Sequence, residues 1–188
     1  PASSLSNLVS NAGVVATDVT GVGTARSEPA ACSYSSSKDK GIFAYGYTSS
    51  VVSMSNLVAN TGIIASDVTG VGTARYYLAA CEYAGDNGIM AYGNDPSNTA
   101  VSNLVSNVGV VATDVTGVGT TRASLAACGY GYDKGIFGYG YSGGYVSMSN
   151  LVSTSGVIAT DTTGVGTARA DVAACEYGGD KGIFGYGN

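Results

Sequence analysis

Residues 55–75 read SNLVANTGIIASDVTGVGTAR, and nearly the same stretch occurs at 6–26, 102–122 and 149–169. The step from one occurrence to the next is 49 residues once and 47 residues twice. Each stretch is followed by A-A-C and then by G-I-[FM]-x-Y-G. The chain is therefore a repeat protein. A repeat of this length buries its apolar face only against neighbouring repeats, in a solenoid or a ring.

The composition favours strands and turns over helices. Gly accounts for 29 of the 188 residues, Val, Ile, Thr and Tyr recur, and charged residues make up only 11%. The net charge of −5 argues against nucleic acid as a partner, because phosphate binding needs a basic surface. No apolar run approaches the ~18–20 residues of a membrane-spanning helix. We therefore expect an all-β protein with no membrane span.

The second repeat illustrates the strands that we expect in each repeat. Residues 75–83 are extended, 85–88 (GDNG) form a hairpin turn, and 89–92 return. A third strand is expected at 102–106 and a fourth at 110–113. Four antiparallel strands in about 47 residues are typical of one blade of a β-propeller.

The ends of the chain predict how the blades close. The sequence starts at a third strand and stops after a second strand. We therefore predict a single domain over 1–188, a four-bladed β-propeller with repeats at about 26–74, 75–121, 122–168, and 169–188 joined with 1–25. Pairing of the N- and C-terminal hairpins would close the ring. Two alternatives are an open solenoid and a polymer in which the N-terminal hairpin completes a blade of the next subunit.

The order of these elements resembles the kelch repeat of β-propellers. The shared pattern is an Arg, a strand of small residues, an Asp/Gly turn, the strand I-F-x-Y-G, and two further strands. Kelch repeats usually carry a Gly-Gly pair after the second strand and a later Tyr and Trp. This chain has Tyr-Gly at that position and no Trp. The resemblance implies the propeller fold, which serves binding, enzymatic and structural proteins alike.

The sequence carries no catalytic constellation. It contains no His, which removes Ser-His-Asp and Cys-His activation and the commonest metal ligand. A catalytic site needs different residues at one point, whereas this chain presents the same residues at four equivalent points. We therefore predict no enzymatic activity, no bound metal and no cofactor.

One cysteine occurs in each repeat, in the strand that we expect to lie innermost. These residues are Cys32, Cys81, Cys128 and Cys175. Three interpretations stay open: two disulfides between blades, a metal site of four thiolates, and a ring of buried thiols that pack as small apolar side chains. No local C-x-x-C spacing supports the metal site.

Two charged residues also recur. They are Asp18, Asp67, Asp114 and Asp161, with Arg26, Arg75, Arg122 and Arg169. A calcium loop at the aspartates would need six or more oxygen ligands, and no second acid lies nearby in the motif. We expect a structural turn in which the carboxylate accepts backbone N–H groups or pairs with the Arg.

The 14 tyrosines include six that lie outside the two Tyr positions found in every repeat. Exposed Tyr covers a large contact area at low entropic cost, so these six are candidates for an assembly or ligand surface. They are Tyr47, Tyr76, Tyr77, Tyr132, Tyr141 and Tyr145.

These observations lead to two functional hypotheses. The first is a non-enzymatic structural protein that assembles with itself into an extracellular filament, tube or similar homopolymer. A weakly charged surface favours such association, because charge repulsion is small. The alternative is a lectin-like propeller that binds repeated carbohydrate at several sites and gains affinity by avidity.

Overall fold

The computed structural model describes residues 2–188, which form strands and turns and contain no helix. Consequently no helix in this part of the chain could cross a membrane. The strands are β1 (Ala30–Tyr34), β2 (Lys40–Ala44), β3 (Ser55–Val58), β4 (Ala79–Tyr83), β5 (Asn87–Ala91), β6 (Asn94–Asp95), β7 (Ser97–Asn98), β8 (Ser102–Val105), β9 (Ala126–Tyr130), β10 (Lys134–Gly138), β11 (Ser149–Val152), β12 (Ala173–Tyr177) and β13 (Lys181–Gly185).

The strands form small antiparallel sheets that repeat along the chain. Three of them have three strands each, in the orders β1-β2-β3, β4-β5-β8 and β9-β10-β11, and β12 pairs with β13. The register is the same in every repeat, because each Cys lies opposite the Ile of the returning strand. The predicted all-β architecture of repeated antiparallel sheets is confirmed. A separate small hairpin, β6-β7, lies in the loop after β5.

The fourth strand that we expected in each blade is reduced to isolated bridges. In the second repeat these join Ser102 to Val115 and Val105 to Val111. The reason is local: the side-chain amide of Asn103 donates to the carbonyl of Ala112 at 3.0 Å. A side chain thereby takes a place that a backbone N–H would occupy in a regular ladder.

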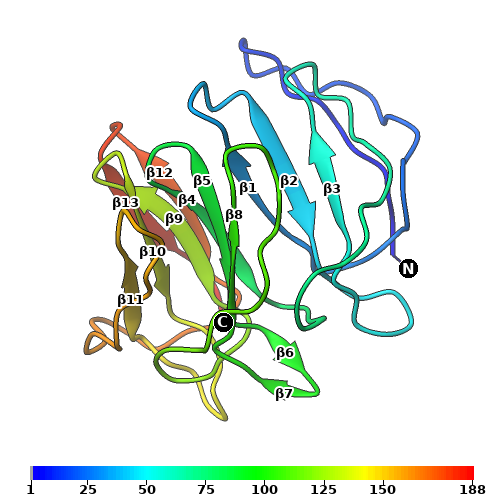
Figure 1. Cartoon of the computed structure of the whole chain (residues 1–188). Coiled ribbons are helices and arrows are strands. Elements are labelled where there is room, and N and C mark those ends of the chain that lie inside the picture. The colour runs from blue at the N-terminus through cyan, green and yellow to red at the C-terminus, as the bar shows by residue number, and fades with distance from the viewer. Residues whose placement is uncertain (1) are drawn as a thin grey trace.

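The sheets pack side by side through their first strands. β1 packs on β4, β4 on β9, and β9 on β12, so the sheets fan out from this inner layer (Figure 1). Two apolar clusters fill the space between them. Ile42, Ile89, Phe137, Val105 and Val152 from the strands are almost fully buried there. Burial of such side chains is the main force that holds one sheet against the next.

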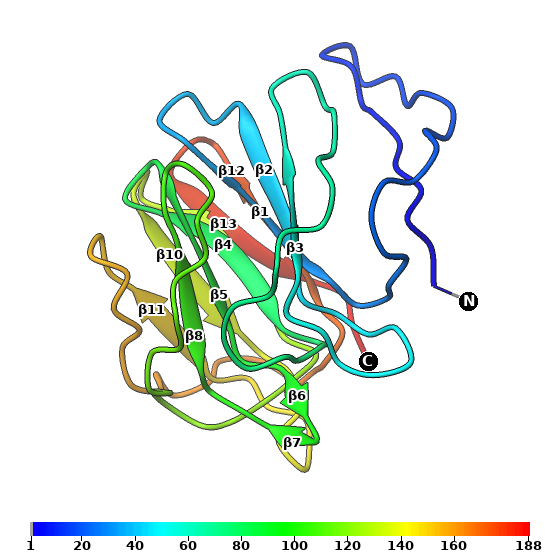
Figure 2. The same ribbon diagram turned by 45° about the vertical axis from the view of Figure 1, so that its right-hand side comes forward.

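The expected pairing of the N- and C-terminal hairpins does not form within residues 2–188. β13 pairs with β12, while the bridges of Ser6 and Val9 run to Val19 and Val15 of their own hairpin. Residues 2–25, here called the N-terminal arm, lie beside β3 and away from β12 and β13 in both views (Figures 1 and 2). Each hairpin is positioned by the one before it, and these successive placements leave the two hairpins apart. A closed propeller ring is therefore not found.

Candidate functional site

Three of the four cysteines pack between repeats, and the four do not meet at one point. The structure gives all four as free thiols, with Cys81 and Cys128 buried and Cys175 exposed. A Cβ atom added to Gly88, Gly135 or Gly182 would come within 2.6–2.7 Å of the Sγ atom of the preceding repeat. Each of these thiols thus fits against a glycine of the next sheet. Within residues 2–188, no group of His, Cys, Asp or Glu residues could hold a metal ion.

Burial disfavours the thiolate form of three of these cysteines. It raises the pKa of Cys32 to about 12 and that of Cys128 to about 11. Burial also raises the pKa of Cys81 well above its usual range. A thiol that stays protonated at neutral pH is a poor nucleophile and a poor metal ligand. Cys32, Cys81 and Cys128 therefore pack as small apolar side chains between repeats, whereas Cys175 is exposed.

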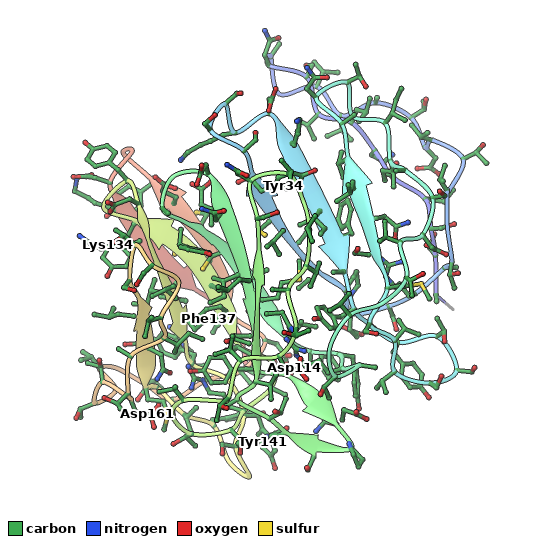
Figure 3. The ribbon with its side chains drawn as sticks, viewed as in Figure 1. Tyr34, Asp114, Lys134, Phe137, Tyr141 and Asp161 are labelled. Carbon is green, nitrogen blue, oxygen red and sulfur yellow. The ribbon has the colours of Figure 1, made fainter. Side chains whose placement is uncertain are left out.

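The repeated aspartates hold one repeat to the next. Asp67 accepts hydrogen bonds from the backbone N–H and the hydroxyl of Thr24, the latter at 2.7 Å, and from the Asn56 amide at 2.9 Å. The same set recurs at Asp114 and Asp161, the two aspartates labelled in Figure 3. We call this arrangement the Asp–Asn–Thr clasp. It spans 41–43 residues of sequence, so it is a contact between repeats and not a local turn.

The repeated arginines stack on tyrosines of the preceding repeat. The guanidinium of Arg75 lies 4.3 Å from the ring centroid of Tyr45, and Arg122 and Arg169 have the same relation to Tyr92 and Tyr139. The predicted ion pairs with Asp are long, 3.9 Å for Arg26–Asp67 and 4.0 Å for Arg122–Asp161. These N–O distances are at the outer limit for an ion pair, whereas a guanidinium 4.1–4.7 Å from a ring centroid is well within the range of a cation–π contact.

Arg75 also ties together several backbone segments. Its Nε donates to the Tyr92 carbonyl at 2.8 Å, and its Nη2 donates to the Asn103 side-chain oxygen at 2.8 Å. Burial lowers the pKa of this guanidinium, which remains charged because the ordinary pKa of Arg exceeds about 12. The predicted structural role of the repeated Arg is consistent with these contacts.

The tyrosines in the Tyr-Gly pairs adopt an unusual backbone conformation. Their φ angles lie between 60° and 65° at Tyr45, Tyr92, Tyr139 and Tyr186. A bulky residue rarely adopts positive φ, so the surrounding structure must hold it there. The following glycine is required, because a Cβ atom on Gly46 would lie 2.6 Å from the Ser27 carbonyl oxygen. This geometry directs the Tyr ring into the next repeat.

The six tyrosines proposed for a surface fall into two clusters and one separate residue. Tyr76 lies between Tyr47 and Tyr77, with ring centroids 5.5 and 4.6 Å apart, and Tyr141 contacts Tyr145 at 6.1 Å. Tyr132 stands alone and is largely exposed. The clusters differ between repeats and do not form four equal sites.

Residues whose equivalents are buried between repeats are exposed on two faces of the molecule. Ile42 and Ile89 are 1% and 0% exposed, whereas the equivalent Ile183 on β13 is 53% exposed. On the N-terminal arm, Val9 is 65% exposed, against 0% for Val105, which occupies the same position in β8. We call the outer side of the β12–β13 hairpin the C-terminal face. We call the outer side formed by the N-terminal arm together with β1 and β2 the N-terminal face.

Sequence reasoning missed two parts of these contacts. It treated the Asn of S-N-L-V as an ordinary strand residue, and it assigned no role to the Thr of G-V-G-T. Both are polar residues that recur unchanged in all four repeats, and this recurrence could have indicated a structural role.

The comparisons with known proteins give no family. No family model matches the chain, and no curated protein sequence matches it. The resemblance to kelch repeats therefore stays a prediction. The contacts described above are what define this molecule: apolar packing, the Asp–Asn–Thr clasp and the Arg–Tyr stack, each of which joins one repeat to the next.

Proposed function

We propose that the protein is a non-enzymatic structural protein whose copies join head to tail into an extracellular homopolymer. One observation carries this proposal. Inside the chain, the second strand of each repeat pairs with the third strand, as in β2–β3, β5–β8 and β10–β11. β13 is a second strand with an exposed edge, and the N-terminal arm carries a third strand with an exposed edge, so the two have the edges that such a pair requires. Addition of a strand from one chain to a free edge in another is a common mode of association.

The internal pairs define the register of the proposed contact. Because Ile42 lies opposite Leu57, Ile183 of one copy would lie opposite Leu8 of the next. The clasp and the cysteine contact would continue as well, with Thr167 donating to Asp18 and Cys175 packing against Gly41. Burial of each large apolar side chain in this contact would contribute on the order of 1–2 kcal/mol.

The symmetry of this contact favours a filament. The two faces differ, so each copy uses one face for the preceding copy and the other for the following copy. Such heterologous contacts give open polymers unless the rotation happens to close. The low charge of the chain, −5 over 188 residues, keeps repulsion between copies small.

The test is a pair of cysteines placed across the proposed strand pair. In a chain with the four native cysteines changed to Ala, Leu8→Cys and Ile183→Cys would lie directly opposite each other. Opposite residues of antiparallel strands have Cβ atoms about 4.5–5.5 Å apart, close to the range that a disulfide spans. The matched control combines Ile183→Cys with Val14→Cys, which lies in the outer part of the arm.

We expect mild oxidation to give a ladder of covalent multimers in the Leu8/Ile183 variant and little cross-linking in the control. Negative-stain electron microscopy of the unmodified chain should show filaments whose number rises with concentration. A cross-linked monomer would contradict the proposal, because it would mean that the hairpins pair within one chain. Isolated particles at every concentration would contradict it too.

Carbohydrate binding is a second candidate function, and the cluster of Tyr47, Tyr76 and Tyr77 favours it. Exposed aromatic rings suit stacking against sugar faces. A glycan array probed with the unmodified chain and with Tyr77→Ala tests it. Binding that free sugar competes away and that the variant loses would support this function, and an empty array would contradict it.

A further inference from the structure

A hollow on the N-terminal face is lined by the kinds of residue that surround buried tyrosine side chains elsewhere in the molecule. It lies between the N-terminal arm and the first sheet, and Leu5, Val22, Arg26, Pro29 and Phe43 are among its walls. We propose that this hollow binds the side chain of Tyr186 from a second copy of the chain. The proposal rests on the head-to-tail assembly proposed above and names the residue that anchors it.

The interior of the molecule contains three examples of the same contact. Tyr45 lies under the guanidinium of Arg75 at 4.3 Å, and its hydroxyl donates to the Val71 carbonyl at 3.1 Å. Tyr92 repeats this arrangement with Arg122 and Val118. In the third example, Tyr139 contacts Arg169, Val165 and Phe184.

The residues that line the hollow occupy the same positions of the repeat as the residues that contact Tyr45, Tyr92 and Tyr139. Arg26 is equivalent to Arg75, and Val22 is equivalent to Val71. Phe43 is equivalent to Phe137, whose ring lies 5.5 Å from that of Tyr92. A tyrosine in the hollow would therefore meet a guanidinium, a carbonyl acceptor and an aromatic edge.

Tyr186 is prepared for this contact. Its φ of 60° matches the 63° of Tyr45 and the 65° of Tyr92, so its backbone already has the conformation that directs the ring outward. Tyr45 and Tyr92 are 0% exposed, but Tyr186 is 90% exposed. An exposed aromatic side chain whose backbone already has the conformation of the contact is typical of an interface anchor, because less entropy is lost when it binds.

The backbone around Tyr186 completes the match. The N–H of Tyr45 donates to the Met54 carbonyl at 2.9 Å, and the N–H of Gly46 donates to the Arg75 carbonyl at 2.9 Å. The equivalent acceptors on the second copy are the carbonyls of Leu5 and Arg26, which flank the hollow.

The experiment uses the full chain with Tyr186→Trp. The natural sequence has no Trp, so the variant carries a single indole, which reports the environment of position 186 alone. We expect its emission to shift to shorter wavelength as the concentration is raised and the chain assembles, because the indole leaves water. Tyr132→Trp is the matched control, since Tyr132 is 70% exposed and faces no proposed contact. Its emission should not shift.

A second variant measures the contribution of the side chain. Tyr186→Ser should raise the concentration needed for half-maximal assembly in sedimentation by about tenfold or more, as expected for the loss of an aromatic anchor. Tyr132→Asn should leave this concentration unchanged.

The outcomes separate the anchor from the polymer. Assembly of Tyr186→Trp without a shift in its emission, or unchanged sedimentation of Tyr186→Ser, would overturn the anchor and leave the polymer standing. No assembly of the unmodified chain would overturn both. A shifted emission that does not depend on concentration would mean that the side chain at position 186 occupies the hollow of its own chain, which overturns the role of a second copy.

Discussion

Asp67 illustrates how one residue couples two repeats. Its carboxylate accepts from Thr24 and Asn56, and these bonds are the principal cause, Thr24 first, of a pKa below the ordinary Asp value. Burial opposes the ionisation of Asp114 more strongly, yet the bonds from Thr73 and Asn103 still lower its pKa. The clasp therefore stabilises the folded chain only while the carboxylates are ionised.

The sign of the pH dependence follows from the lowered pKa. The stabilisation is complete above the unfolded pKa of about 4 and is lost as the pH falls through the lower folded pKa. We expect the free energy of unfolding, measured in urea, to fall with acidification below about pH 4. Asp67→Asn should lower the free energy of unfolding by about 1–3 kcal/mol at neutral pH, because the NH₂ group of the new Asn would face the hydrogen-bond donors of Thr24 and Asn56.

The same variant should also weaken the acid dependence. Asp133→Asn, in an exposed turn, is the control and should resemble the unmodified chain at every pH. Equal acid slopes for Asp67→Asn and the unmodified chain would mean that the clasp does not contribute as we describe.

At the scale of the strands, glycine sets how closely one sheet approaches the next. Gly135 on β10 faces Cys81, and a Cβ atom there would lie 2.6 Å from the Sγ atom and 3.2 Å from the Glu82 carbonyl oxygen. We expect Gly135→Ala to destabilise the chain by about 1–3 kcal/mol through overpacking. Urea unfolding provides the measurement.

Two further variants identify the cause. Gly144→Ala has no atom within 4 Å of the added methyl group and should have little effect. In the double variant Cys81→Ala/Gly135→Ala the sulfur is removed, so the two changes should cost less together than the sum of their separate costs. Additive costs would show that the Cys–Gly contact does not determine the spacing of the sheets.

The strands that the sequence predicts well are those with a strong local pattern. The A-A-C strand, its hairpin turn and the I-F-x-Y-G strand form as expected, since turn residues and β-branched or aromatic residues specify them locally. The fourth strand was predicted from Val110 and Val111, but the Asn103 amide takes over a backbone acceptor there. Alternation of apolar residues does not reveal that a side chain will replace part of a ladder.

At the scale of the whole molecule, the similarity of the two ends to an internal junction predicted a pairing that does not form within residues 2–188. The junction of Tyr186 to Ser6 resembles an internal junction whether the hairpins belong to one chain or to two. What separates these cases is the orientation of each sheet on the one before it. That orientation depends on side-chain packing between repeats, such as Phe137 against Tyr92, and is not encoded in any local motif.

A polymer built through two different faces has a direction, and this gives the last prediction. Ile183→Asp places a carboxylate on β13 where an apolar contact is required, while the N-terminal face of the variant is unchanged. Burying an unpaired charge is strongly unfavourable. The variant should therefore still add to the end of a filament through its N-terminal face, but its own β13 should not bind the next copy. A small fraction of it mixed with the unmodified chain should therefore shorten filaments in electron microscopy. Asp133→Asn, in the exposed turn before β10 and on neither of the two proposed faces, should not. If the variant leaves filament length unchanged, β13 is not the growing edge and the copies join through another surface.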